Sequence, residues 1–197
     1  MEFCLSQTRQ NMARAFAGLC QDSARLEFMS KDASADQMHY LAFLLENMAK
    51  HKIAQAQRLQ QSILENNLHS NDNVPIEAGY PFEKNDIKTS LNRQAVIEEF
   101  EGGNLFLQFA RVAKDEGFLK IATLFELIAK VSSKHSKILK VLSKDYNKRN
   151  LYKNSTPLCW VCSNCGNFVT SLHSWQSCPL CQKEKGYVIL PQEKLTP

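Results

Sequence analysis

The spacing of apolar side chains predicts a pair of helices in the first part of the chain. Across residues 6–31, apolar positions recur at alternating steps of four and three residues, which places them on one face of a helix. A second helix is expected to begin near Ser34, a plausible N-cap, and to reach Ile63. Its apolar face weakens midway, at His51, Ala54 and Gln55.

A second pair of helices is expected after a long connection. Residues 69–88 are rich in Asn, Asp, Pro and Gly, which favour turns. A crossover between parallel neighbours of a helix bundle would explain a connection of this length. The third helix is predicted from about Thr89 to a C-cap at Gly117, and the fourth keeps a seven-residue apolar repeat as far as Leu142. This order predicts a mainly α protein built on a ferritin-like four-helix bundle.

Two Cys-x-x-Cys pairs near the C-terminus predict a metal site formed by Cys162, Cys165, Cys178 and Cys181. Each pair spans a tight turn that points two thiolates at one place, and two pairs complete a tetrahedron. Spacing alone does not distinguish iron, which would carry an electron, from structural zinc. The surrounding segment has few apolar residues, so a metal is expected to support its folding.

These patterns divide the chain into three parts. We expect the bundle over residues 1–145, a polar linker over 146–158, and the small four-Cys domain over 159–197.

Composition narrows the class of protein. The formal charge of +4 over 197 residues is spread along the chain, so no nucleic-acid partner is expected. There is no apolar run long enough for a membrane span, and the N-terminus lacks a secretion-signal pattern. Outside the Cys-x-x-Cys pairs, Cys4, Cys20 and Cys159 have no spacing partner, which favours a reducing, cytoplasmic location over a disulfide framework.

Polar side chains interrupt the apolar faces of the predicted bundle. Glu98 and Glu101 lie one turn apart on the third helix, His135 lies on the face of the fourth, and His51 lies at the weak patch of the second. Buried carboxylates without partners are costly, so these groups are expected to meet either a cation or one another. The pattern leaves both alternatives open.

The chain resembles the rubrerythrin family over almost its whole length. The resemblance rests on the helical layout, the two Cys pairs, and three local runs, at residues 15–18, 109–118 and 160–166. It implies a rubredoxin-like iron site, a carboxylate-bridged di-iron site in the bundle, and reduction of hydrogen peroxide with electrons passed from the first site to the second. It also implies a homodimer. A redox partner protein is a further expectation for a protein that transfers electrons.

The ligand set that the resemblance implies for the bundle is only partly present. Glu98, Glu101 and His135 match the family's pattern, whereas other ligand positions are replaced, by Leu19, His51, Ala54 and Ser132. Asp22, one turn after Leu19, is a candidate replacement carboxylate.

Too few carboxylates remain to neutralise two iron ions in a low-dielectric bundle. We therefore expect either one Fe, Zn or Mn ion, held by His51, Glu98, Glu101 and His135, or no bundle metal. Two functions follow. One is a rubrerythrin-like redox protein that transfers electrons at the four Cys, with weakened or lost peroxide reduction. The other is a non-catalytic relative with structural zinc, acting as an interaction or structural protein.

Overall fold

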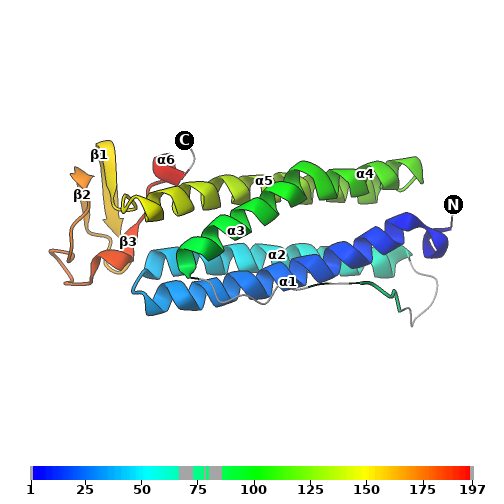
Figure 1. The fold of residues 1–197 in the computed structure, drawn as a ribbon, viewed down its shortest axis with the longest axis horizontal. Coiled ribbons are helices and arrows are strands. Elements are labelled where there is room, and N and C mark those ends of the chain that lie inside the picture. The colour runs from blue at the N-terminus through cyan, green and yellow to red at the C-terminus, as the bar shows by residue number, and fades with distance from the viewer. Residues whose placement is uncertain (1, 67–72, 78, 80–85, 196–197) are drawn as a thin grey trace.

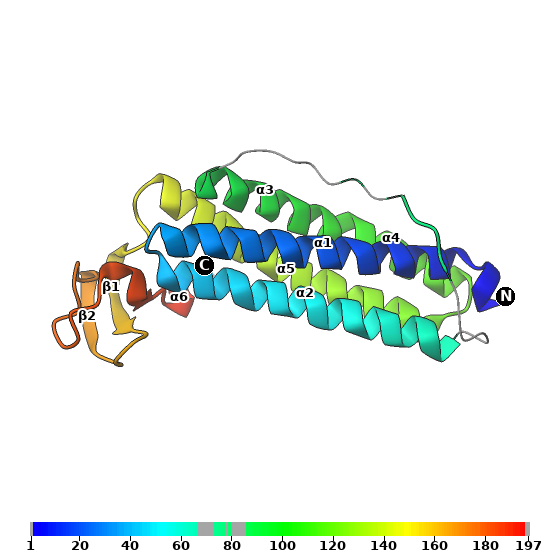
Figure 2. The same ribbon diagram turned by 90° about the horizontal axis from the view of Figure 1, so that it is seen from below.

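A long helical bundle carries a small sheet domain at one end (Figures 1 and 2). The computed structural model describes residues 2–66, 73–77, 79 and 86–195. The bundle contains α1 (Gln7–Ala35), α2 (His39–Asn66), α3 (Ile87–Phe100), α4 (Phe106–Asp115) and α5 (Leu119–Asn147). A π-helical segment, η2 (Glu101–Leu105), joins α3 to α4. A short 3-10 helix, η1 (Phe3–Leu5), precedes α1.

The chain order of the bundle agrees with a crossover between parallel helices. α1 and α2 pack as an antiparallel pair, and α3 begins at the same end of the bundle as α2 (Figure 1). α5 returns antiparallel to α3 and α4 and packs along both. The ferritin-like bundle fold predicted from the pattern is therefore confirmed. Much of the connection predicted for residues 69–88 lies outside the described residues.

Local capping explains where several helices begin. The Ser6 side chain accepts a hydrogen bond from the Arg9 N–H, and the Asp86 side chain accepts one from Thr89 N–H at 2.8 Å. The expected N-cap at Ser34 is wrong, because α1 continues through Ala35 and the turn is made at Gln37, whose φ is +59°. Gly117 ends α4 with a φ of +89°, as its C-cap prediction requires.

The core of the bundle has two apolar sections. One section, toward the sheet domain, is built around Leu26, Leu45, Leu91 and Leu139; the other is built around Met12, Leu19, Phe106 and Phe125. Buried polar side chains, among them Asp22, Lys52, Glu98, Glu101 and Ser132, fall in sequence between residues of the two sections. The bundle thus holds a polar layer between two apolar ones.

The small domain is a three-stranded antiparallel sheet with strand order β2-β1-β3. Its strands are β1 (Lys153–Cys162), β2 (Phe168–His173) and β3 (Val188–Ile189), followed by a short helix, α6 (Gln192–Leu195). A 3-10 helix, η3 (Lys185–Tyr187), precedes β3. The segment expected to be a linker, 146–158, contains the end of α5 and the first half of β1.

Several contacts fix the small domain against the bundle. A Cβ built on Gly186 would lie 1.7 Å from the Gln37 carbonyl oxygen, so the two backbones meet there too closely for any side chain. His39 Nε2 lies 3.0 Å from Glu184 Oε1, and Lys194 Nζ lies 2.6 Å from Asp145 Oδ2. None of the described helices is both long and apolar enough to cross a membrane.

Candidate metal centre

The four sulfur atoms of the Cys-x-x-Cys pairs converge in the small domain. Each of Cys162, Cys165, Cys178 and Cys181 has its sulfur within 4.8 Å of the other three. Across the two turns, the sulfurs of Cys162 and Cys181 are 3.7 Å apart, and so are those of Cys165 and Cys178. A tetrahedron with metal–sulfur bonds of about 2.3 Å has edges of about 3.8 Å, so the arrangement fits one metal ion.

The two turns that carry these Cys residues have matching backbone conformations. Gly166 N–H donates to the Cys162 carbonyl and Gln182 N–H donates to the Cys178 carbonyl, both at 2.9 Å. Gly166 and Gln182 also share a left-handed φ, of +74° and +61°. Glycine adopts this left-handed conformation without steric cost, which explains why Gly166 follows the first Cys-x-x-Cys pair.

Backbone N–H groups point at the outer sulfurs. The Lys183 N–H donates to the thiolate of Cys181 and lowers the pKa of that thiol to about 6. Asn167 N–H also donates to Cys165, but burial and the hydrogen bonds with the other three thiols outweigh it and raise the pKa of Cys165 to about 12. Cys162 and Cys178 are buried, whereas Cys165 and Cys181 are half-buried, so one side of the cluster faces the surface. The three remaining Cys residues lie outside the cluster.

In the bundle, a lysine occupies the centre of the polar layer. Lys52 is fully buried, and its Nζ lies 2.6 Å from Glu101 Oε2, 2.9 Å from Glu98 Oε2 and 3.3 Å from Asp22 Oδ2. It also donates to Ser132 Oγ at 3.2 Å. These contacts bring together residues from α1, α2, α3, η2 and α5. We call Asp22, Lys52, Glu98 and Glu101 the Lys52 cluster.

The two histidines of the predicted bundle site lie beside this cluster. His135 Nδ1 is 3.4 Å from Glu98 Oε1, and His135 Nε2 is 3.2 Å from His51 Nδ1. The His51 side chain is exposed, and among the described residues its hydrogen bond is with His135 and not with the carboxylates. Glu98, Glu101 and His135 are therefore brought together, whereas His51 reaches them only through His135.

The electrostatics of the Lys52 cluster favour an ammonium. Burial acts to lower the pKa of Lys52, but Glu101, Glu98 and Asp22 outweigh it and raise the pKa well above its ordinary value. Burial would raise the pKa of Glu98, yet the hydrogen bond with His135 and the charge of Lys52 hold it below its usual value. Burial, then the charges of Asp22 and Glu98, raise the pKa of Glu101 to about 8 despite Lys52.

Sequence reasoning missed Lys52, although a signal was present. The apolar face of α2 advances from Leu41 by alternating steps of four and three residues, through Leu45 and Met48. The next step of four leads to Lys52. The ligand spacing of the family points instead to His51 and Ala54, and Ala54 is exposed. Asp22, considered only as a replacement for Leu19, does lie with Glu98 and Glu101.

The residues of the polar layer do not fit a di-iron cofactor. A divalent ion among Asp22, Glu98 and Glu101 would share their oxygens with the ammonium of Lys52, at a place where water does not screen the repulsion. Where the family's pattern has a further Glu, Ser132 supplies only a hydroxyl. No chemistry at an iron pair is therefore expected in this bundle.

Together, the bundle and the four-thiol site define a ferritin-like helical protein with a rubredoxin-like metal domain. The rubrerythrin family model matches residues 91–157. Rubrerythrin from Clostridium perfringens is 30% identical over 183 residues, which cover 92% of this chain and 93% of that protein. The chain belongs to the rubrerythrin family, whose members support its assignment as a non-haem iron redox protein.

Other relatives agree with this assignment. Rubrerythrin-1 of Clostridium acetobutylicum is 28% identical over 92% of this chain and 93% of its own length. Among solved structures, nigerythrin in its mixed-valence state superposes with a TM-score of 0.62 at 19% identity, covering 93% of this chain and 86% of that one. At that level of identity, the superposition supports the fold alone.

Proposed function

We propose that this protein carries single electrons at an iron ion held by Cys162, Cys165, Cys178 and Cys181. The observation that carries the proposal is the convergence of the four sulfurs at tetrahedral spacing. Iron bound by four thiolates takes up and releases one electron. Iron is preferred over zinc because the chain belongs to a family of non-haem iron proteins.

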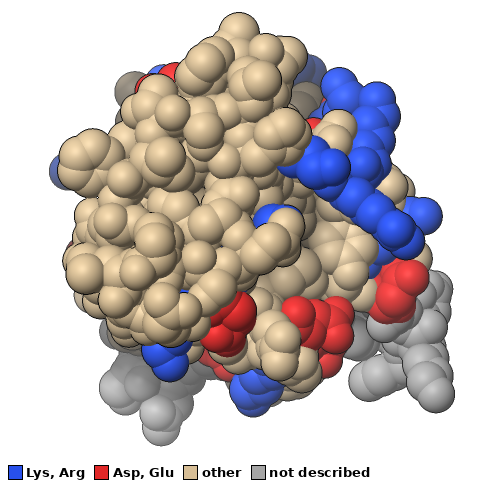
Figure 3. Space-filling model, turned by 90° about the vertical axis from the view of Figure 1, so that its left-hand side faces the viewer, with Lys and Arg blue, Asp and Glu red and all other residues tan. Residues whose placement is uncertain are grey.

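The protein supports this role through the backbone and surface around the sulfurs. Hydrogen bonds from Lys183 N–H and Asn167 N–H stabilise negative charge on the outer thiolates, which influences the reduction potential of the site. Most of the surface at this end of the molecule carries no charged side chain (Figure 3). Leu180, which lies between two of the ligands, is 67% exposed. Such a surface suits brief contact with a redox partner protein.

We further expect peroxide reduction in the bundle to be weakened or lost. Glu98, Glu101 and His135 are present, but Lys52 lies among the carboxylates that an iron pair would need. We further propose that the protein works in the cytoplasm and as a homodimer, as its unpaired Cys residues and the family resemblance lead us to expect.

The test is the metal content and visible spectrum of protein purified without added metal. One iron per chain, with a red colour that bleaches on reduction, supports the proposal. Cys162→Ser should lose the colour, whereas the matched variant Cys159→Ser should keep it, because Cys159 is exposed and outside the cluster. A colourless protein with one zinc per chain would contradict electron transfer and favour the structural or interaction role.

A further inference from the structure

We propose that the Lys52 ammonium is the resident cation of the bundle, so that this bundle folds without metal and takes up none. Lys52 contacts Glu98, Glu101 and Ser132, which stand at three of the family's ligand positions. A side chain of this protein therefore supplies positive charge where the family resemblance leads one to expect iron.

Oxygen atoms surround the Lys52 ammonium as they would surround a bound cation. An ammonium has three N–H donors, and this one has oxygen partners at 2.6, 2.9 and 3.2 Å, with the Asp22 oxygen at 3.3 Å. The side chain has no solvent exposure, and its partners are also buried. A buried charge is tolerated only when paired and hydrogen-bonded in this way.

The carboxyl groups of the Lys52 cluster already have cationic partners, so a metal ion would add positive charge to a site that contains it. Besides Lys52, Asp22 accepts from Arg25 Nη1 at 2.6 Å, so two cationic side chains face three carboxyl groups. Adding a divalent ion would place it beside two fixed positive charges in a low-dielectric interior. The ion would first have to displace Lys52, which is enclosed by the bundle on all sides.

Mn²⁺ is a suitable probe because it prefers carboxylate oxygens to thiolates, so the four-Cys domain does not compete for it. The full-length protein is equilibrated with excess Mn²⁺ or with a chelator, and bound Mn²⁺ and Tm are measured. The variants are Lys52→Met, which removes the ammonium, and Lys50→Met as the control. Lys50 lies on the same helix, but it is exposed and forms an ion pair with the exposed Glu46.

We expect the wild type and Lys50→Met to bind no Mn²⁺ in the bundle, and we expect the Tm of the bundle, followed by its helical circular dichroism, to be the same with chelator or Mn²⁺. In chelator, Lys52→Met should lose on the order of 10 °C in Tm, because three buried carboxyl groups lose their central cation. Mn²⁺ should restore part of that loss by binding only the folded state.

Two results would overturn the proposal. One is Mn²⁺ uptake by the wild type that Glu98→Gln abolishes, and the other is a Lys52→Met protein as stable in chelator as the wild type. If Lys52→Met does not fold, the wild-type titration still decides, with Lys52→Arg as the variant that keeps the charge. The outcome is independent of which metal the four Cys bind.

Discussion

At the scale of single residues, the bundle depends on a small group of buried charges whose partners come from different helices. Glu98 illustrates the arrangement, since its two oxygens face Lys52 at 2.9 Å and His135 at 3.4 Å. Glu99, the next residue, is exposed and pairs with Lys140. A carboxylate therefore contributes to stability at the buried position 98 but contributes little at the exposed position 99.

Replacing Glu98 by Gln should lower the free energy of unfolding by about 1–3 kcal/mol, the usual worth of a buried hydrogen bond to a charged group. Glu99→Gln is the matched control and should change it by less than about 1 kcal/mol. Urea unfolding in the presence of a chelator measures both. Equal effects of the two variants would contradict the role assigned to Glu98.

The sequence predicted these residues unevenly. The Cys ligands could be predicted because a Cys-x-x-Cys turn brings two thiols together without help from the rest of the fold. Glu98, Glu101 and His135 were identifiable because they interrupt apolar faces. Lys52 was missed because a lysine at a core position is rare, and only the tertiary arrangement of three carboxylates makes its burial tolerable.

At the scale of elements, the π-helical segment η2 packs closely on α5 at Gly102. A Cβ on Gly102 would lie 2.4 Å from Ser133 Oγ, 2.6 Å from Ser133 N and 2.8 Å from the Ala129 carbonyl oxygen. Gly103, its neighbour, has open space around the same position. A π-helical turn contains one more residue than an α-helical turn. Here it begins directly after Phe100, at Glu101, which belongs to the Lys52 cluster.

Gly102→Ala should lower the free energy of unfolding by about 1–3 kcal/mol, because the backbone of α5 must move to admit the methyl group. Gly103→Ala should be neutral or stabilise by up to about 1 kcal/mol, since Ala favours helical backbone. Thermal unfolding of both variants checks the contrast. A harmless Gly102→Ala would mean that the two helices are not in such close contact.

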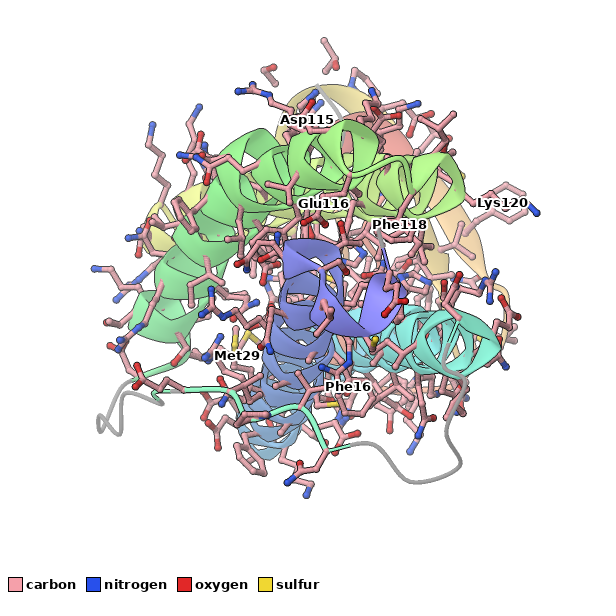
Figure 4. The ribbon with its side chains drawn as sticks, turned by 90° about the vertical axis from the view of Figure 1, so that its right-hand side faces the viewer. Phe16, Met29, Asp115, Glu116, Phe118 and Lys120 are labelled. Carbon is pink, nitrogen blue, oxygen red and sulfur yellow. The ribbon has the colours of Figure 1, made fainter. Side chains whose placement is uncertain are left out.

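The start of α1 is capped by a side chain distant in sequence. Glu116 accepts from Gln7 N–H at 2.9 Å and from Thr8 N–H at 2.8 Å, and it lies above that helix end in Figure 4. Burial would raise the pKa of Glu116, but the hydrogen bonds from Thr8 and Gln7 outweigh it and lower the pKa below its usual value. A negative charge here also favours the helix N-terminus.

The pKa of Glu116 is lower in the folded state than in the unfolded state. Glu116 therefore stabilises the folded protein fully at pH values above the unfolded-state pKa, and this stabilisation is lost as the pH falls through the folded-state pKa. Glu116→Gln should cost about 1 kcal/mol near neutral pH and progressively less in acid. Asp115→Asn, at an exposed neighbouring position, is the control. Unfolding free energies measured across pH 3–7, a range set by carboxyl titration, test this difference. A cost that is the same at every pH would contradict it.

Element boundaries were predicted less well than the elements themselves. The helices were expected from apolar periodicity, but η2 divides the third predicted helix into α3 and α4. The turn between α1 and α2 falls at Gln37, a residue with no turn signal in the sequence. The polar stretch after α5 contains half of β1, because Leu151 is buried against the bundle and the sheet extends toward it. Tertiary contacts of this kind are not visible in a local pattern.

At the scale of the whole molecule, the protein combines a small metal-ready domain with a bundle whose centre already holds a cation. The two parts differ in what they need. The four converging thiols are arranged to hold a metal ion, whereas the carboxylates of the bundle already have Lys52 and Arg25 as cationic partners. This difference leads us to assign the redox role to the four-Cys domain alone.

The most direct test of this account is the metal stoichiometry of the full-length protein after purification without added metal and reconstitution with excess ferrous iron. The account predicts one iron per chain in the wild type, bound by Cys162, Cys165, Cys178 and Cys181, and none after Cys162→Ser. Two further irons per chain that remain in Cys162→Ser would contradict it, because they would have to lie in the bundle where Lys52 is placed.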